Sequence, residues 1–375
     1  MNARNILLQN AKNLLGWRTD RKIVVFAVDD YGNVRLHSKE ARQKLDMAGL
    51  PTYNRFDAFD SLETKQDLAI LYETLSSVND KNGRNAVFTA YTVPCNINFE
   101  KIAETNYEEY HYEVISETYQ KLATSDASAY KGGWELWKEG IEKGLMVPQF
   151  HGREHLNVNL FNEKLEAEDH DLMTCLKNRS FTSIKSNEDK LISPMAAFDF
   201  WQFKENEHFH GILEDGLIQF ENVFGTRAQN FTPPVYSAHP VLHKTLKKHG
   251  IRFVDMAMIS SVHQGQGKFD KKFNYTGKKN DEGLCLIVRN VVFEPSANYD
   301  IDWPSYVMQQ IEAAFRWNRP AVISSHRVNF CGHINEDNRK KGVKALHELL
   351  KRITDRWPEV EFMAANELGE LIVSE

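Results

Sequence analysis

The 375-residue sequence contains little cysteine, and its four cysteines stand far apart without a CxxC pair. This spacing excludes a thiolate metal site and fits a reduced compartment, in which we expect Cys95, Cys175, Cys285 and Cys331 to be ordinary thiols. Hydrophobic residues make up 42% of the chain and charged residues 26%. A chain of this composition can bury a substantial core without disulfides.

The N-terminal segment lacks the features of a signal peptide or a membrane span. A signal peptide needs an apolar core of about 7 to 15 residues, and a span needs about 18 or more apolar residues. In residues 1–21 the apolar side chains are interrupted by Asn, Gln and Lys. We therefore expect a cytoplasmic protein without integral membrane association, whose amphipathic residues 1–21 pack on the main domain.

Long basic runs are also absent, and the formal net charge is −6. This balance argues against a nucleic-acid partner, which would need clustered Lys and Arg side chains. No internal repeat, low-complexity tract or Pro/Gly/Ser-rich linker divides the chain. We therefore expect a single domain over residues 22–375.

Short apolar runs alternate with helical patterns along the chain, which is typical of βα units around a parallel sheet. We predict a distorted (β/α) barrel of about seven parallel strands. The predicted strands are residues 22–28, 85–93, 146–150, 229–232, 252–256, 320–325 and 360–364. The predicted helices include residues 135–143, 240–248, 305–318 and 338–357. Insertions near 156–224 and 260–300, the latter with apolar runs at 284–293, are expected to form lobes or lids over the barrel mouth.

Three of the predicted strands lead into side chains suited to metal and proton chemistry. The strand IVVFAVDD ends in Asp29 and Asp30, MVPQF runs into His151 and His155, and PAVISS precedes His326. Catalytic groups of α/β barrels lie at the C-terminal ends of the strands, so we expect these side chains at one mouth. A spacing of four residues on a helical turn would place the two imidazoles of the second motif on one face.

Two imidazoles and one carboxylate make a three-ligand site with open positions, the pattern of catalytic rather than structural zinc. Of two adjacent carboxylates, one can bind a cation while the other acts as a base on water. Each motif also has a structural alternative, an acidic turn for the aspartates and core packing for a histidine. Zinc is the default metal for this donor set, with manganese, cobalt and nickel as alternatives.

In their order, these motifs resemble those of the polysaccharide deacetylase family, the NodB homology domain of family-four carbohydrate esterases. VDDYG is similar to the first family motif, HGREH to the second, FTPPVYSAHP to the third and VISSHRVNF to the last. The resemblance spans residues 22–371, nearly the whole chain. It implies Asp29 as catalytic base, His326 as general acid, and one divalent metal ion held by Asp30, His151 and His155.

Two positions depart from the family pattern. Thr232 stands where the family usually has an arginine that orients the base, and Gly152 stands where a Ser or Thr usually supports the histidine loop. The fourth motif is not clear, and its candidates are Glu294, Asp302 and Trp303. The departures affect the network around the base and the substrate, and they leave the predicted metal ligands in place.

The resemblance implies a metal-dependent hydrolase that removes an N- or O-linked acetyl group from a carbohydrate, such as an oligosaccharide or an activated sugar. The expected substrate contacts are Tyr236, Trp303, Pro233 and Asn96. One alternative is a metal-independent glycoside hydrolase with paired carboxylates. Its candidate acids are Asp29, Glu154, Glu294 and Asp302. Another alternative is a sugar-binding protein that has kept the fold without turnover.

Overall fold

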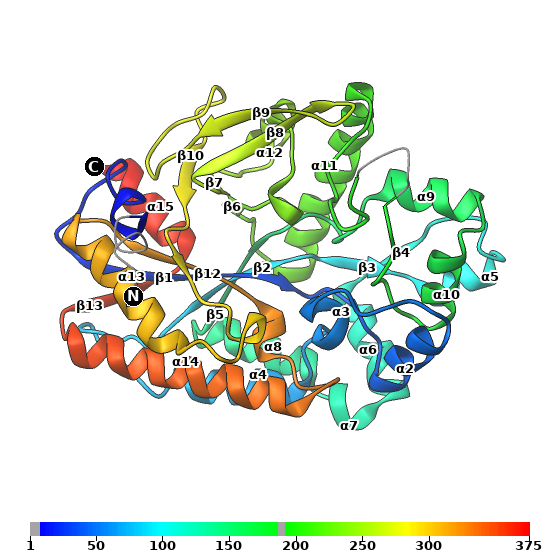
Figure 1. The fold of residues 1–375 in the computed structure, drawn as a ribbon, viewed down its shortest axis with the longest axis horizontal. Helices are drawn as coiled ribbons and strands as arrows, with labels where there is room; N and C mark the ends of the chain where they lie inside the picture. Colours follow the sequence, from blue (N-terminus) through cyan, green and yellow to red (C-terminus); the bar gives the residue numbers. More distant parts are fainter. Residues whose placement is uncertain (1–7, 187–191) are drawn as a thin grey trace.

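The core of the protein is a sheet of nine strands, in which every strand pair is parallel. The structure is a computed structural model, and it describes residues 8–186 and 192–375 (Figure 1). The strands of this sheet are β1 (Lys22–Tyr31), β2 (Phe88–Thr92), β5 (Met146–Phe150), β6 (Asn230–Phe231), β7 (Phe253–Met256), β10 (Cys285–Val288), β11 (Val291–Val292), β12 (Ala321–His326) and β13 (Val360–Met363).

The sheet is curled, and its strand order is β10-β7-β6-β5-β2-β1-β12-β11, with β13 on the first half of β1. The two strands at the ends of this order, β10 and β11, are separated only by residues 289 and 290. One stretch of chain therefore pairs with β7 at its start and with β12 at its end. This topology confirms the predicted distorted parallel α/β barrel.

The apolar strand runs are long because the sheet is covered on both faces. In β1, residues 23–28 are fully buried. Helices and short 3-10 turns surround the sheet, and in Figure 1 α4 and α14 lie along one side of it. The α-helices are α2 (Lys39–Met47), α3 (Arg55–Phe59), α4 (Lys65–Leu75), α5 (Phe99–Glu104), α6 (Ile115–Ser125), α7 (Ala127–Tyr130), α8 (Gly133–Glu142), α9 (Val158–Glu166), α10 (His170–Lys177), α11 (Asn206–Phe224), α12 (His243–Lys248), α13 (Trp303–Arg316), α14 (Glu336–Arg356) and α15 (Ala365–Ser374).

All seven predicted strands are present, but the expectation for residues 284–293 was wrong. These residues form β10 and β11 of the main sheet and not a lobe or lid. The side chains of β10 are all buried, which explains the continuous apolar run. The insertion before them is a separate antiparallel hairpin of β8 (Ile259–Gly265) and β9 (Lys268–Phe273). A second small hairpin pairs β3 (Cys95–Ile97) with β4 (Tyr112–Val114).

The other predicted insertion, residues 156–224, contributes α9, α10 and α11 to the body of the protein. The ring of Phe220 on α11 lies 6.1 Å from that of Phe150 at the end of β5. The insertion therefore packs against the strand that leads to the two histidines.

The described part of the N-terminal segment, from residue 8, lies against the barrel. The guanidinium of Arg319 donates to the carbonyls of Asn13 and Leu14, each at 2.9 Å. The side chain of Asn290 donates to Asn13 Oδ1 at 2.8 Å. Residues 1–7 of the predicted segment lie outside the described residues.

All four cysteines are buried and unpaired, as the sequence predicts. Within residues 8–186 and 192–375, no helix is both long and apolar enough to cross a membrane.

Candidate metal centre

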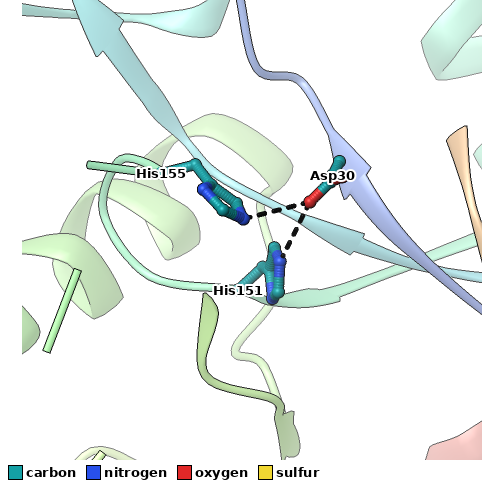
Figure 2. Close-up of side chains that lie close together, drawn as sticks. All are labelled: Asp30, His151 and His155. Atoms are coloured by element: carbon teal, nitrogen blue, oxygen red, sulfur yellow. Dashed lines mark ion pairs between the residues drawn. The ribbon is translucent and has the colours of Figure 1, made fainter. Parts of the chain in front are cut away.

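Asp30, His151 and His155 meet as a buried cluster of metal-binding side chains (Figure 2). One donor atom from each lies within 4.8 Å of the others. Asp30 Oδ1 is 3.4 Å from His151 Nε2 and 3.1 Å from His155 Nε2. The three predicted ligands, from β1 and from the loop after β5, are therefore brought together with their donor atoms converging.

Asp30 reaches this position because the backbone of β1 turns at its end. Successive side chains of a regular strand point to opposite faces, which would separate Asp29 from Asp30. Asp30 has a φ of +73°, and the pairing of β1 with β2 shifts register between Val28 and Tyr31. A left-handed backbone at a non-glycine residue is strained and is common at functional sites. Here it allows both carboxylates to face one cavity.

The two histidines lie on a bent loop, and the helical turn expected from their spacing is absent. Their ring centroids are 5.1 Å apart. The loop is anchored by backbone bonds from His151 N to Thr92 O, at 3.1 Å, and from Cys95 N to Arg153 O, at 3.0 Å. Gly152 between them has a φ of +102°, a conformation that a Ser or Thr would adopt only with strain. This backbone explains the glycine at that position.

The protonation of the histidines suits metal binding. His151 Nδ1 lies 2.8 Å from the carbonyl oxygen of Thr232, so Nδ1–H donates there and Nε2 presents its lone pair towards Asp30. Burial lowers the pKa of His155, which favours the neutral imidazole that ligates metals. The residues therefore fit a divalent cation, although His155 Nδ1 has no partner among the described residues.

Asp29, beside this cluster, is held by an arginine that the sequence analysis missed. Arg289, between β10 and β11, donates from Nη1 to Asp29 Oδ2 at 2.6 Å and from Nη2 to Asp29 Oδ1 at 2.8 Å. Its Nε donates to Asp255 Oδ2 at 3.1 Å. Burial would raise the pKa of Asp29, but the guanidinium keeps it below its ordinary value.

Arg289 therefore makes the contact that the family pattern led us to expect near Thr232. The side chain of Thr232 instead makes a long contact of 3.5 Å to Asp255 O, while its carbonyl fixes His151. The sequence indicated the role of Arg289 only by its position after the apolar run of residues 284–288, at the end of a strand. Because that run was assigned to a lid, no contact between this arginine and the base was expected.

His326 is the last residue of β12, and the strand register places it beside Asp29. Its Nδ1 lies 2.6 Å from Glu294 Oε1, and its Nε2 lies 3.9 Å from Asp29 Oδ2. Burial opposes the charged form, but Glu294 outweighs it and raises the pKa of His326 to about 9. Glu294 is in turn held by Asn329 Nδ2, at 2.8 Å, and Arg55 Nη2, at 2.7 Å. Of the three candidates for the fourth motif, Glu294 is the one that contacts His326.

These groups open on a cavity of about 260 Å³. Its lining residues are Asp29, Asp30, Arg35, Phe56, His151, His155, Met195, Pro233, Val235, Tyr236 and His326. Two of the four predicted substrate contacts, Pro233 and Tyr236, are among them. Val235 and Tyr236 have φ values of +56° and +54°, so a strained turn presents this wall of the cavity.

The other two predicted substrate contacts, Trp303 and Asn96, are not in this lining. Trp303 is only 7% exposed on α13 and donates from Nε1 to Asn298 O at 2.8 Å. Asn96 ties the end of β1 to β3, because its amide accepts from Val34 N and donates to Gly32 O, each at 2.8 Å. Both side chains have structural roles in these contacts.

Comparisons with known proteins give weak matches at the level of fold. No protein-family model matches the sequence, and no curated protein matches it. Three solved structures illustrate this similarity of fold. A probable polysaccharide deacetylase of Pseudomonas aeruginosa PAO1 has 8% identity and a TM-score of 0.45, over 94% of this chain and 91% of that one. An allantoinase has 7% identity and a TM-score of 0.46, with the same coverage. A candidate glycoside hydrolase/deacetylase of Parabacteroides distasonis has 12% identity and a TM-score of 0.48, over 96% and 72%.

Proposed function

We propose that this protein is a metal-dependent hydrolase that removes an acetyl group, N- or O-linked, from a carbohydrate. The observation that carries the proposal is the buried cluster of Asp30, His151 and His155, which opens on the same cavity as Asp29 and His326. The sequence motifs that resemble polysaccharide deacetylases supply these same five residues.

The metal ligands are Asp30 through a carboxylate oxygen and the two histidines through Nε2. A divalent cation at this site, zinc by the donor set, would polarise the acyl carbonyl and lower the pKa of water from about 16 towards 7. Thr232 fixes the ring of His151 through Nδ1, so that this imidazole needs no reorientation to bind.

Asp29 is the proton acceptor in this proposal. Its carboxylate is ionised at neutral pH, because Arg289 keeps its pKa low. It lies beside Asp30 in the chain and faces the same cavity, where it can take a proton from the attacking water. Arg289 binds both carboxylate oxygens and so fixes the plane of the base.

His326 is the proton donor. With a pKa of about 9 it carries a proton at neutral pH, and Glu294 holds its Nδ1 so that Nε2 points towards the cavity. The departing amine or hydroxyl would receive the proton from Nε2. A base held ionised and an acid held protonated, side by side at one cavity, are the pair that acyl transfer to water requires.

The cavity favours a small substrate or the end of a larger one. At about 260 Å³ it lies near the lower limit of small-molecule sites. Phe56 and Tyr236 bring aromatic rings to its lining, and such rings can stack on the apolar face of a sugar.

No observation favours the glycoside hydrolase alternative. Of its four candidate acids, only Asp29 is in the cavity lining. Glu154 is bound by Arg153 through both oxygens, at 2.5 and 2.7 Å. Asp302 caps the N-terminus of α13 by accepting from Ser305 N at 3.1 Å. Glu294 is engaged by His326, and a pair of free carboxylates across one glycosidic bond is therefore lacking among these four.

The test is an acetate-release screen on N-acetylated and O-acetylated sugars. Wild-type protein loaded with zinc should release acetate from at least one of them, and Asp29→Asn should abolish release while it keeps its metal. Loss of metal in Asp29→Asn would mean that the roles of the two aspartates are reversed. Release of sugar in place of acetate would support the glycosidase instead.

A further inference from the structure

Arg35 is a buried cation in the wall of the metal cavity, and its guanidinium is unsatisfied. The residue is only 6% exposed and lies in the cavity lining. A guanidinium carries five N–H donors. None of them makes a hydrogen bond to any residue that the structure describes, and Nε is both buried and without a partner.

The other buried arginines of the described chain donate more hydrogen bonds, although Nε of Arg42 and of Arg339 is also buried without a partner. Each donates at least two hydrogen bonds to carboxylates, hydroxyls or carbonyls. They are Arg42, Arg153, Arg319, Arg327 and Arg339. Arg55, which shares a neighbour with Arg35, binds Glu294 at 2.7 Å. Arg35 therefore stands apart from the other arginines in its surroundings.

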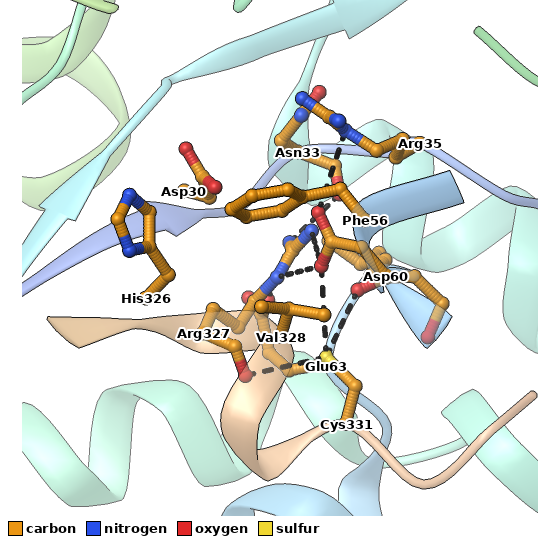
Figure 3. A network of polar contacts seen from close by, with 12 residues as sticks. Asp30, Asn33, Arg35, Phe56, Asp60, Glu63, His326, Arg327, Val328 and Cys331 are labelled. Carbon is orange, nitrogen blue, oxygen red and sulfur yellow. Dashed lines mark hydrogen bonds and ion pairs between the residues drawn. The ribbon is translucent and has the colours of Figure 1, made fainter. Parts of the chain in front are cut away.

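The nearest carboxylate to Arg35 is Asp60, and it already serves another arginine. Asp60 Oδ1 accepts from Arg327 Nε at 3.2 Å and from Arg327 Nη2 at 2.8 Å (Figure 3). Asp60 Oδ2 lies 3.6 Å from Arg35 Nε, which is too long for a hydrogen bond. Asp60 thus lies on the Nε side of the Arg35 guanidinium, as an ion pair at 3.6 Å. Both Nη atoms of the guanidinium remain available to another partner.

Phe56 sets the direction of this guanidinium. Arg35 lies over the Phe56 ring, 5.0 Å from its centroid, and the ring is also 4.8 Å from the guanidinium of Arg55 and 5.3 Å from the imidazole of His326. In Figure 3 the ring lies between Arg35 and His326. Phe56, Arg35 and His326 all line the cavity. A group bound by Arg35 is therefore in the cavity that contains the metal ligands.

A buried guanidinium whose N–H groups lack hydrogen-bond acceptors is costly, and an arginine fork matches the two oxygens of a carboxylate or phosphate. We propose that Arg35 is the specificity-determining residue of this site, and that it binds an anionic group, a carboxylate or a phosphate, on the substrate whose acyl group is hydrolysed. The inference deepens the proposed function and rests on it for the reaction. It adds a substrate class, an acylated carbohydrate that bears a negative charge close to the scissile bond.

A binding experiment tests the anion site without turnover. Chelated, metal-free protein is titrated calorimetrically with inorganic phosphate and, separately, with acetate, so that neither anion can bind through the cation. Wild type should bind one of the two at a single saturable site, which also distinguishes a phosphate site from a carboxylate site. Arg35→Gln should bind at least about tenfold more weakly. Arg35→Lys should lie between them, because it keeps the charge and loses the planar fork.

Arg227→Gln is the matched control. It removes the same charge from an exposed arginine whose partner is Glu221, on the surface. It should bind the anion as wild type does. Thermal unfolding of the Arg35 variants distinguishes anion binding from a purely structural role. If Arg35 only supported Asp60, its replacement would lower the melting temperature and leave anion affinity unchanged. Equal affinity in wild type and Arg35→Gln, or no saturable binding by wild type, would overturn the proposal.

A second arm uses three compounds with the same acetamide: N-acetylglucosamine, its 6-phosphate and N-acetylmuramic acid. The metal-loaded enzyme should have a higher kcat/KM for one of the anionic compounds. Arg35→Gln should lower the ratio of anionic to neutral kcat/KM at least about tenfold. Equal turnover of neutral and anionic compounds by both proteins would refute the anion site and keep the hydrolase. If none of the three is hydrolysed, the hydrolase is not supported, and the binding experiment decides the anion site alone.

Discussion

The guanidinium of Arg289 holds both carboxylate oxygens of Asp29, although the two residues are 260 positions apart in the chain. The contact forms because the stretch from β10 to β11 joins the two edges of the curled sheet, and the side chain of Arg289 on this stretch reaches Asp29 on β1. The base of the proposed reaction is therefore positioned by the element that joins the edges of the barrel.

Replacing Arg289 with Gln should shift the acid limb of kcat/KM to higher pH. The pKa of Asp29 is held low by this guanidinium, so its loss lets burial raise that pKa, and the base becomes protonated at a higher pH than in wild type. We also expect kcat/KM at neutral pH to fall about tenfold or more. The pH profile and the metal content are measured together. An unshifted acid limb with normal metal content would show that Arg289 does not tune the base.

Replacing Glu294 with Gln should shift the alkaline limb to lower pH. Glu294 raises the pKa of His326 to about 9, and the acid works only while it is protonated, so activity is present below that pKa and is lost above it. Without the carboxylate, burial lowers the pKa and the loss begins earlier. The check is kcat as a function of pH. An alkaline limb that stays in place would assign it to another group.

Replacing Gly342 with Ala should destabilise the protein and disturb the support of Glu294, which keeps the general acid His326 protonated. A Cβ at this position on α14 would lie 1.8 Å from the carbonyl oxygen of Asn329, whose amide holds Glu294. Such overpacking costs about 1–3 kcal/mol or more. Gly211→Ala on α11 is the matched control, since no atom lies within 4 Å of its added Cβ. It should stabilise by up to about 1 kcal/mol. Urea unfolding measures both, and equal effects would contradict the contact.

Much of the fold was predictable because strands covered on both faces need apolar residues throughout. The seven predicted strands follow from that rule, and so do the metal ligands, because functional groups collect where parallel strands end. β6 and β11 have only two residues each, and β10 has four, so their signals are brief. β10 and β11 were not predicted for a further reason: their apolar runs suit a lid as well as a strand.

The details of the site lay beyond the sequence because they depend on backbone conformation. The positive φ of Asp30 and the register shift after Val28 turn two neighbouring aspartates towards one cavity. The histidine loop reaches the same end by a bend at Gly152 and not by a helical turn. An aromatic side chain such as that of Trp303 is typical of the wall of a sugar-binding site, but the packing of α13 buries it. Residue type alone does not distinguish these outcomes.

The central claim, a divalent metal ion held by Asp30, His151 and His155, is tested most directly by the metal content of purified variants. Plasma mass spectrometry should find about one equivalent of metal per chain in wild type and in Asp29→Asn after zinc loading. Asp30→Ala and His151→Ala should lose most of it. Wild type should lose acetate release on complete chelation and regain it when zinc is restored. Full metal content in Asp30→Ala, or full activity after complete chelation, would contradict the account.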